Sequence, residues 1–105
     1  MTTFDERERE FEARFKHDQE LQFKVTARRN RLLGLWAAER MGLVGDAAQA
    51  YAKEVVEAEF KGGDRHVVAK LVADLAAKGQ GTSEAQVKFE LDHFAGQAKQ
   101  QIMQE

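Results

Sequence analysis

The chain contains no proline, and Gly34 is the first glycine along it, so no earlier residue ends a helix by its backbone chemistry. The span Phe4–Met41 therefore predicts one long helix or two helices in series, roughly 55 Å long at about 1.5 Å per residue. The other helices that the sequence predicts are less than half that length. We therefore expect the front end either to project beyond the fold or to fold back at a break near residues 17–20.

The first part of this span is charged, and its large apolar side chains, Phe4, Phe11 and Phe15, fall at i, i+7 and i+11 on one helix face. The same face then presents Asp18 and Gln22, so the apolar stripe is interrupted. Oppositely charged residues four apart, worth only ~0.2–0.5 kcal/mol a pair, would stabilise such a helix in solvent; they are Asp5–Arg9, Glu10–Arg14, Glu12–Lys16 and Glu20–Lys24.

Two interpretations of the Phe stripe remain open. It could belong to an ordinary surface helix whose three phenylalanines contact the core of this chain. It could instead belong to an arm whose apolar stripe is completed only in the groove of a partner. The length of the span and the interruption of the stripe favour the arm.

From residue 21 the pattern becomes that of a core helix, with Val25, Leu33 and Trp36 on one side. Gly34 lies in the middle of this helix at a cost of about 1 kcal/mol relative to alanine. Its presence predicts that a neighbouring helix approaches closely. Gly42 predicts the C-terminal end of the helix.

Three further helices are predicted over residues 46–60, 64–78 and 83–104, capped by Asp46, Asp64 and Ser83. Their apolar positions recur at helical spacing: Tyr51, Val55 and Ala58; Val68, Leu71 and Leu75; Val87, Leu91, Ala98 and Ile102. Short connections make neighbouring helices antiparallel. The sequence therefore predicts an all-α fold, a four-helix bundle over residues 21–105 with a long first helix, and a mobile or projecting N-terminal arm over residues 1–20.

Composition narrows the chemistry that a chain of 105 residues, one domain in length, can perform. A net charge of −2 gives no general attraction to nucleic acid or membrane, and no apolar run approaches the ~18 residues of a spanning helix. There is no cysteine, and His17, His66 and His93 are scattered singly. We expect no metal, no cofactor and no enzymatic activity, and a soluble cytoplasmic domain.

A basic run over residues 24–31 contains no acidic residue. The simpler interpretation is a solvated helix face whose arginines lie over apolar neighbours. The alternative is a contact for an anion, for instance a weakly bound adenine nucleotide near Lys24, Arg28, Arg29 and Trp36. Nucleic acid is disfavoured, because acidic residues on both sides of the run dilute its field.

One long run of residues resembles a known family. It reads Phe4-Asp5-Glu6-Arg7-Glu8-Arg9, Phe11-Glu12-Ala13, Phe15, His17-Asp18, Glu20-Leu21, Phe23-Lys24, Ala27-Arg28-Arg29-Asn30, Leu32-Leu33-Gly34 and Trp36-Ala37-Ala38. With Tyr51-Ala52-Lys53-Glu54-Val55-Val56, Asp64 and Ser83-Glu84-Ala85, it resembles the zeta subunit family of alphaproteobacterial F-type ATP synthases over nearly the whole chain.

The resemblance implies a four-helix bundle that regulates the synthase by inhibiting ATP hydrolysis in its soluble head. It implies that the N-terminal amphipathic helix inserts between catalytic and rotor subunits, without direct membrane insertion. The protein would be cytoplasmic and peripheral to the inner membrane through the synthase. The residues that inhibit or bind the partner would be Phe4, Glu6, Arg7, Arg9, Phe11, Arg14 and Phe15. The alternatives are a ligand-binding bundle, for an adenine nucleotide, and a helical adaptor whose arm docks on another protein.

Overall fold

The computed structural model describes residues 3–105, and side chains from residue 5 onward. This part of the chain contains four helices joined by short connections. They are α1 (Thr3–Phe15), α2 (Gln19–Arg40), α3 (Gly45–Ala77) and α4 (Glu84–Met103). The described residues contain no strand, which confirms the all-α prediction. The side chain of Phe4, one of the three predicted stripe residues, lies outside the described part.

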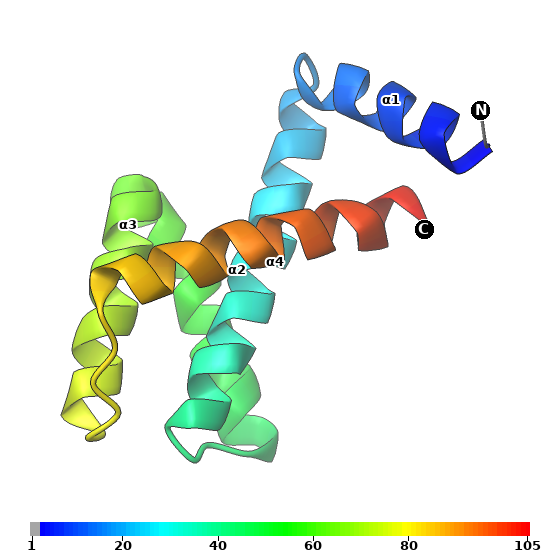
Figure 1. Cartoon of the computed structure of the whole chain (residues 1–105). Helices are drawn as coiled ribbons and strands as arrows, with labels where there is room; N and C mark the ends of the chain where they lie inside the picture. Colours follow the sequence, from blue (N-terminus) through cyan, green and yellow to red (C-terminus); the bar gives the residue numbers. More distant parts are fainter. Residues whose placement is uncertain (1–2) are drawn as a thin grey trace.

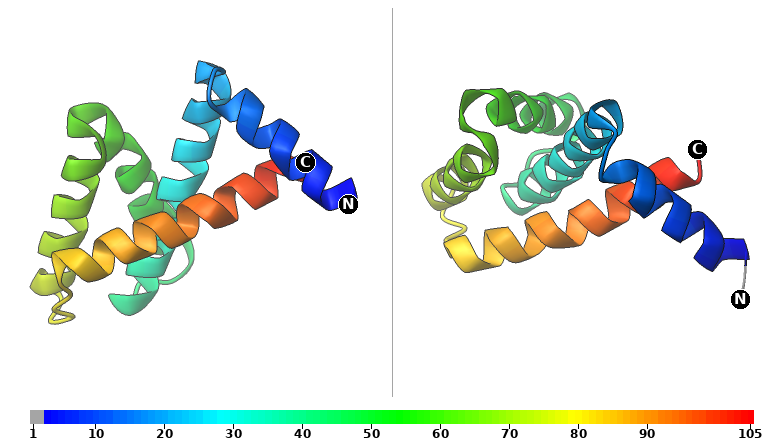
Figure 2. Two further views of the ribbon diagram at one scale, coloured as in Figure 1. Left: turned by 45° about the horizontal axis from the view of Figure 1, so that its top comes forward. Right: turned by 90° about the horizontal axis from the view of Figure 1, so that it is seen from above.

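The helices are arranged around α2, which contacts each of the other three (Figure 1). The first half of α3 runs back beside α2, and its second half turns down next to the first. Helix α4 crosses α2 obliquely. Helix α1 turns away from the start of α2 and lies near the C-terminal end of α4, as both views of Figure 2 show.

The predicted break in the long N-terminal span falls at residues 16–18. Asp18 has an extended backbone (φ −103°, ψ 102°), and its side chain accepts a hydrogen bond from the backbone N–H of Leu21 at 3.1 Å. This is an N-cap, which satisfies one of the free N–H groups at the start of α2. The interruption of the Phe stripe at Asp18 is therefore a corner between two helices.

The helix ends at Gly42 and Ser83 follow the predictions, whereas the one at Asp46 does not. Gly42 has φ +80°, and the N–H of Leu43 donates to the carbonyl of Ala38 at 2.9 Å, so α2 ends in a glycine C-cap. Ser83 accepts from the N–H of Gln86 at 3.0 Å and caps α4 as expected. The prediction that Asp46 caps the next helix is wrong, because α3 starts at Gly45 with Val44 as its N-cap. Asp46 lies in the first turn, where its negative charge interacts favourably with the positive end of the helix dipole.

The two helices predicted over residues 46–60 and 64–78 are the halves of one kinked helix, α3. The prediction that Asp64 caps a separate helix is therefore wrong, and its side chain accepts hydrogen bonds from Arg29. The kink lies at the Gly62-Gly63 pair, between the two predicted ranges, where Gly63 has φ 71° and ψ −158°. Glycine has no Cβ and adopts this conformation readily, whereas other residues seldom do.

The core joins α2, both halves of α3 and the first half of α4. Its wholly buried large side chains include five that the helical spacing predicted, Leu33, Val55, Leu71, Leu75 and Val87, and one that it did not, Val67. At its centre α2 and α3 approach closely beside Gly34, as predicted. A Cβ at Gly34 would lie 2.7 Å from the Cα of Ala52 and 3.1 Å from Cγ2 of Val55.

Substitution of Gly34 tests this close approach. Alanine normally stabilises a helix relative to glycine by about 1 kcal/mol. At Gly34 its methyl group would meet backbone that cannot move cheaply, and overpacking of this kind costs typically 1–3 kcal/mol. We therefore expect Gly34→Ala to lower the free energy of unfolding by about 1 kcal/mol in urea titrations followed by circular dichroism. Gly96→Ala is the matched control, because nothing lies within 4 Å of a Cβ at that position of α4. The control should stabilise the protein, and a Gly34→Ala variant that behaves the same way would contradict the close approach.

Candidate functional site

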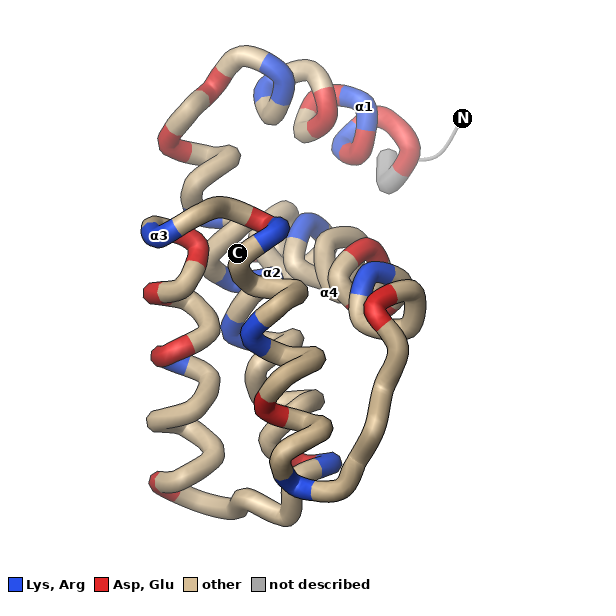
Figure 3. The backbone as a smooth tube through the Cα atoms, turned by 90° about the vertical axis from the view of Figure 1, so that its left-hand side faces the viewer, with Lys and Arg blue, Asp and Glu red and all other residues tan. Residues whose placement is uncertain are grey.

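Helix α1 presents a densely charged face to solvent. The residues that the sequence singled out on it, Glu6, Arg7, Arg9 and Arg14, are all exposed. Basic and acidic segments alternate along the helix in Figure 3. Such a face can exchange ion pairs with a partner without first giving up buried contacts of its own.

The apolar face of α1 has a place to bind within the chain itself. Phe11 is only 6% exposed and packs in a cluster with Leu21 and Val25 of α2 and with Ala98 and Ile102 of α4. Phe15 is partly buried against the same cluster, with its ring centre 6.4 Å from that of Phe11. The structure therefore differs from the expectation that the stripe finds its core only in a partner. The corner at residues 16–18 explains the difference, since it folds α1 back toward the end of α4.

Polar contacts complete the docking of α1. The Nζ atom of Lys99 lies 3.3 Å from Oε1 of Glu12 and 4.3 Å from the centre of the Phe15 ring. Gln22 donates a hydrogen bond from Nε2 to the carbonyl oxygen of Phe15 at 2.7 Å, which satisfies a free carbonyl at the end of α1. We call the bundle residues that receive α1 the α1 seat, and they are Leu21, Gln22, Val25, Ala98, Lys99 and Ile102.

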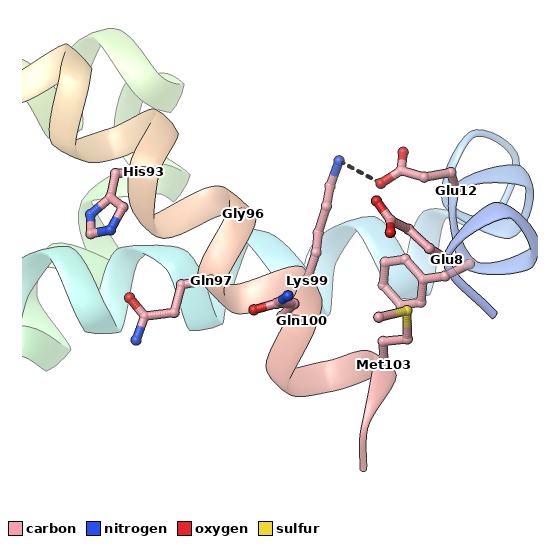
Figure 4. Close-up of a pocket in the computed structure, with 9 residues that line it drawn as sticks. Glu8, Glu12, His93, Gly96, Gln97, Lys99, Gln100 and Met103 are labelled. Atoms are coloured by element: carbon pink, nitrogen blue, oxygen red, sulfur yellow. Dashed lines mark ion pairs between the residues drawn. The ribbon is translucent and has the colours of Figure 1, made fainter. Parts of the chain in front are cut away.

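The α1 seat is small. A cleft of about 730 Å³ lies between α1 and α4, with Glu8 and Glu12 on one wall and His93, Gly96 and Gln100 on the other (Figure 4). Burial of one phenylalanine is worth roughly 1.5–3 kcal/mol, and a partly exposed ion pair rarely more than about 1 kcal/mol. These contacts therefore hold α1 on the bundle by only a few kcal/mol, and the conformational entropy lost when the helix is ordered opposes them.

Lys24 and Arg28 pair with the C-terminal end of the chain. Lys24 lies 3.3 Å from Oε1 of Glu105, and Arg28 pairs with Oε2 of Glu105 and donates to Gln101 at 2.9 Å. Two of the predicted i,i+4 pairs are thereby replaced. Lys24 binds Glu105 and not Glu20, and Glu12 binds Lys99 and not Lys16.

Arg29 points into the protein. It is 9% exposed, and its Nη2 lies 2.8 Å from Glu59 and 2.7 Å from Asp64, one on each side of the kink in α3. The fully buried Asn30 accepts from Arg29 Nε at 3.0 Å and donates to Glu59 at 2.8 Å. This network therefore fixes the kink to α2.

Trp36, the fourth residue of the possible nucleotide contact, is partly buried against the core, with the Arg40 guanidinium 5.2 Å from its ring centre. The structure does not gather Lys24, Arg28, Arg29 and Trp36 around one open pocket. It gives each of the three cations a carboxylate partner within the chain.

The Arg29 network predicts a pH dependence of stability. Hydrogen bonds from Arg29 hold the pKa of Asp64 below its ordinary value, against the desolvation that would raise it. The unfolded chain therefore binds the proton more readily than the folded chain does. The contribution of ionised Asp64 to the stability of the fold is present above the unfolded pKa of about 3.9 and is lost as pH falls through the folded pKa. Because Asp64 is more than half exposed, we expect Asp64→Asn to cost only about 0.5–1 kcal/mol near neutral pH.

Urea unfolding at a series of pH values measures this effect. The difference between the original chain and Asp64→Asn should shrink below about pH 4. Asp92→Asn, which changes an exposed carboxylate of α4, is the control. A difference for Asp64→Asn that stays constant down to about pH 2 would contradict the pairing with Arg29.

Several residues of this site carried little or no signal in the sequence. Asp18 precedes a run of helix-forming residues and could have been recognised as an N-cap. Asn30 lies between apolar positions of α2, where a polar residue indicates a buried network. Lys99, Glu59 and Glu105 gave no local signal, because their partners lie on other helices.

A small helical bundle that carries a charged amphipathic helix on a short linker belongs to the class of proteins that act by contact with another protein. The comparisons with known proteins define that class further. The family model of ATPase inhibitor subunit zeta matches residues 1–101, so the chain belongs to this family of inhibitor subunits. Its role is accordingly regulatory, as an inhibitor of ATP synthase, and the resemblance seen in the sequence is confirmed.

A structure determined by solution NMR has a similar fold, with a TM-score of 0.71 and 44% sequence identity over 80% of this chain and 96% of that chain. A search among curated proteins found no match. Within the described residues, no helix combines the length and the apolar character needed to cross a membrane.

Proposed function

We propose that the chain inhibits ATP hydrolysis by inserting α1 between the catalytic and rotor subunits of the soluble head of F-type ATP synthase. The family supports the inhibitory role. The observation that supports insertion is the character of α1, a separate amphipathic helix on a three-residue linker with a small α1 seat. The protein would be cytoplasmic, and peripheral to the inner membrane through the head.

Insertion requires α1 to leave the α1 seat, because Phe11 cannot be buried in two places. Burial of Phe4, Phe11 and Phe15 in the head would supply roughly 1.5–3 kcal/mol each, and loss of the present contact of Phe11 offsets one of these. The conformational entropy lost when the arm is ordered offsets a further part of this free energy. The apolar stripe alone therefore leaves a narrow margin, and the charged face has to contribute.

Arg7, Arg9 and Arg14 are the donors that we assign to acidic groups of the head, with Glu6 as an acceptor. Hydrogen bonds between ionised groups are about twice as strong as neutral ones, more so when insertion excludes water. The described residues extend over 47 × 26 × 25 Å, whereas a helix with its side chains is about 10–12 Å wide. The bundle would therefore stop at the mouth of a cleft that admits α1, and inhibition would be steric, by blocking rotation.

Neutralisation of these arginines tests the proposal. The triple variant Arg7→Gln, Arg9→Gln, Arg14→Gln should raise the concentration for half-maximal inhibition of ATP hydrolysis by about 10-fold or more, since 1.4 kcal/mol corresponds to tenfold. Its inhibition should also depend less on salt. The matched control changes three exposed cations of α3 and its C-cap, Lys53, Arg65 and Lys78, to glutamine. Equal potency of the two triple variants would contradict the assignment.

A further inference from the structure

Two exposed phenylalanines from different helices meet on the surface of the bundle. Phe23 of α2 is 56% exposed and Phe60 of α3 is 70% exposed, and their ring centres lie 5.8 Å apart. Among the described residues the other large exposed apolar side chains are Val44 and Phe89. Val44 is aliphatic, and the ring of Phe89 is not paired with another described aromatic ring. We call Phe23 and Phe60 the Phe pair.

Packing of the bundle does not account for the Phe pair. The contact between α2 and α3 is already made by wholly buried residues such as Leu33 and Val55, and Gly34 brings the backbones together. The Arg29 network fixes the same part of α3, around its kink, by hydrogen bonds. Two aromatic rings that stay more than half exposed beside a complete interface are typical of a recognition surface.

The position of the Phe pair connects it to α1. The start of α2 and the kinked middle of α3 lie toward the end of the molecule from which α1 departs (Figure 1). The four peptide steps from Phe15 to Gln19 span at most roughly 14 Å, and the helix from Gln19 to Phe23 rises about 6 Å. A protein that holds α1 as far as Phe15 therefore has its surface within roughly 20 Å of Phe23.

We infer that the Phe pair is a second contact for the protein that receives α1, an apolar surface at the mouth of the cleft in the ATP synthase head. This inference rests on the proposed function. Two side chains are too small for an independent interface, which usually buries more than about 1,000 Å². Once α1 is bound, however, the linker holds the Phe pair at high effective concentration, so a weak contact adds substantially to affinity.

This second contact predicts a kinetic signature. It forms after α1 has bound, so its loss should raise the dissociation rate and leave the association rate nearly unchanged. In the full-length chain, Phe23→Ala with Phe60→Ala should raise the dissociation rate from the isolated head by about 10-fold and change the association rate by less than about 2-fold. The single variant Phe60→Ala, at the more exposed position, should show a smaller increase, and it still tests the contact if the double variant unfolds.

The control is Val44→Ala with Phe89→Ala, which removes the other two exposed apolar side chains. It should dissociate at the original rate. The inference is overturned if the Phe-pair variants also dissociate at the original rate, or if the control dissociates as fast as they do. It is overturned as well if sedimentation shows that the original chain is a dimer that the variants disrupt, because a second copy would then cover the Phe pair.

Deletion of residues 2–15 separates this inference from the proposed function. If the deletion leaves inhibition intact, the proposed function fails, whatever the Phe pair does. If the deletion abolishes inhibition and the Phe-pair variants dissociate at the original rate, the second contact alone is wrong.

Discussion

Deletion of residues 2–15 is expected to abolish inhibition of ATP hydrolysis and to leave the bundle folded. The deletion removes Phe11, Phe15 and the three arginines of α1 together. Burial of two or three phenylalanines accounts for several kcal/mol, so the loss in potency should be at least about 100-fold. The main core, which includes Leu33 and Leu71, contains no residue of α1 and should persist.

Two measurements check this result together. Steady-state ATP hydrolysis by the isolated head, titrated with the full-length and the shortened chain, gives the loss in potency. Thermal unfolding followed by circular dichroism shows whether residues 16–105 remain folded. The midpoint should fall by several degrees, because the deletion exposes the α1 seat. A folded, shortened chain that inhibits as well as the full-length chain would disprove the role of α1.

Much of the fold could be predicted from the sequence, because its helices are locally consistent. The apolar positions of α3 and α4 recur at helical spacing, and Leu71, Leu75 and Val87 are wholly buried as expected. Glycine at positive φ marks the end of α2 and the kink of α3. These features depend on residues within a few positions of each other, so a single sequence contains them.

The place of Phe11 could not be predicted in the same way. The interrupted stripe correctly indicates a break, but it is compatible both with a projecting arm, which the sequence favours, and with a helix that folds back. Its actual cause is the N-cap at Asp18, which lets α1 fold back on Ala98 and Ile102. Periodicity shows which face of a helix is apolar. It does not show which other helix, more than 80 positions away, will cover that face.

The basic run illustrates the same limit. A run of cations without acids within it is compatible with a solvated face or, as the alternative, with an anion contact on α2. The carboxylates that neutralise it come from α3 and from the C-terminal end of the chain, as Glu59, Asp64 and Glu105. Only the kink in α3 and the crossing of α4 over α2 bring these partners together.

Covalent attachment of α1 to the bundle is the second prediction with a large effect. The chain has no cysteine, so Glu12→Cys with Lys99→Cys introduces a unique pair of thiols. Because the native side chains of these residues meet at 3.3 Å, a short bismaleimide crosslinker can join the two positions with α1 on the α1 seat. The crosslinked chain keeps all other residues of α1 and should still lose inhibition by at least about 100-fold, since the stripe cannot leave the α1 seat.

A matched crosslink separates this effect from general stiffening of the protein. Glu54→Cys with Lys70→Cys joins the two halves of α3, whose native side chains lie 3.0 Å apart, and leaves α1 free. This chain should inhibit like the original after crosslinking. The Glu12, Lys99 double variant should also inhibit before the crosslinker is added, because the variant loses a contact that holds α1 on the α1 seat.

ATP hydrolysis by the isolated head in the presence of the α1–α4 crosslinked chain is therefore the most direct measurement of the central claim, that α1 leaves the bundle to inhibit. We predict hydrolysis at the uninhibited rate with the crosslinked chain and inhibition with the same variant without crosslinker. Full inhibition by the crosslinked chain would contradict the claim, and would mean that α1 acts from its position on the bundle or that another surface inhibits.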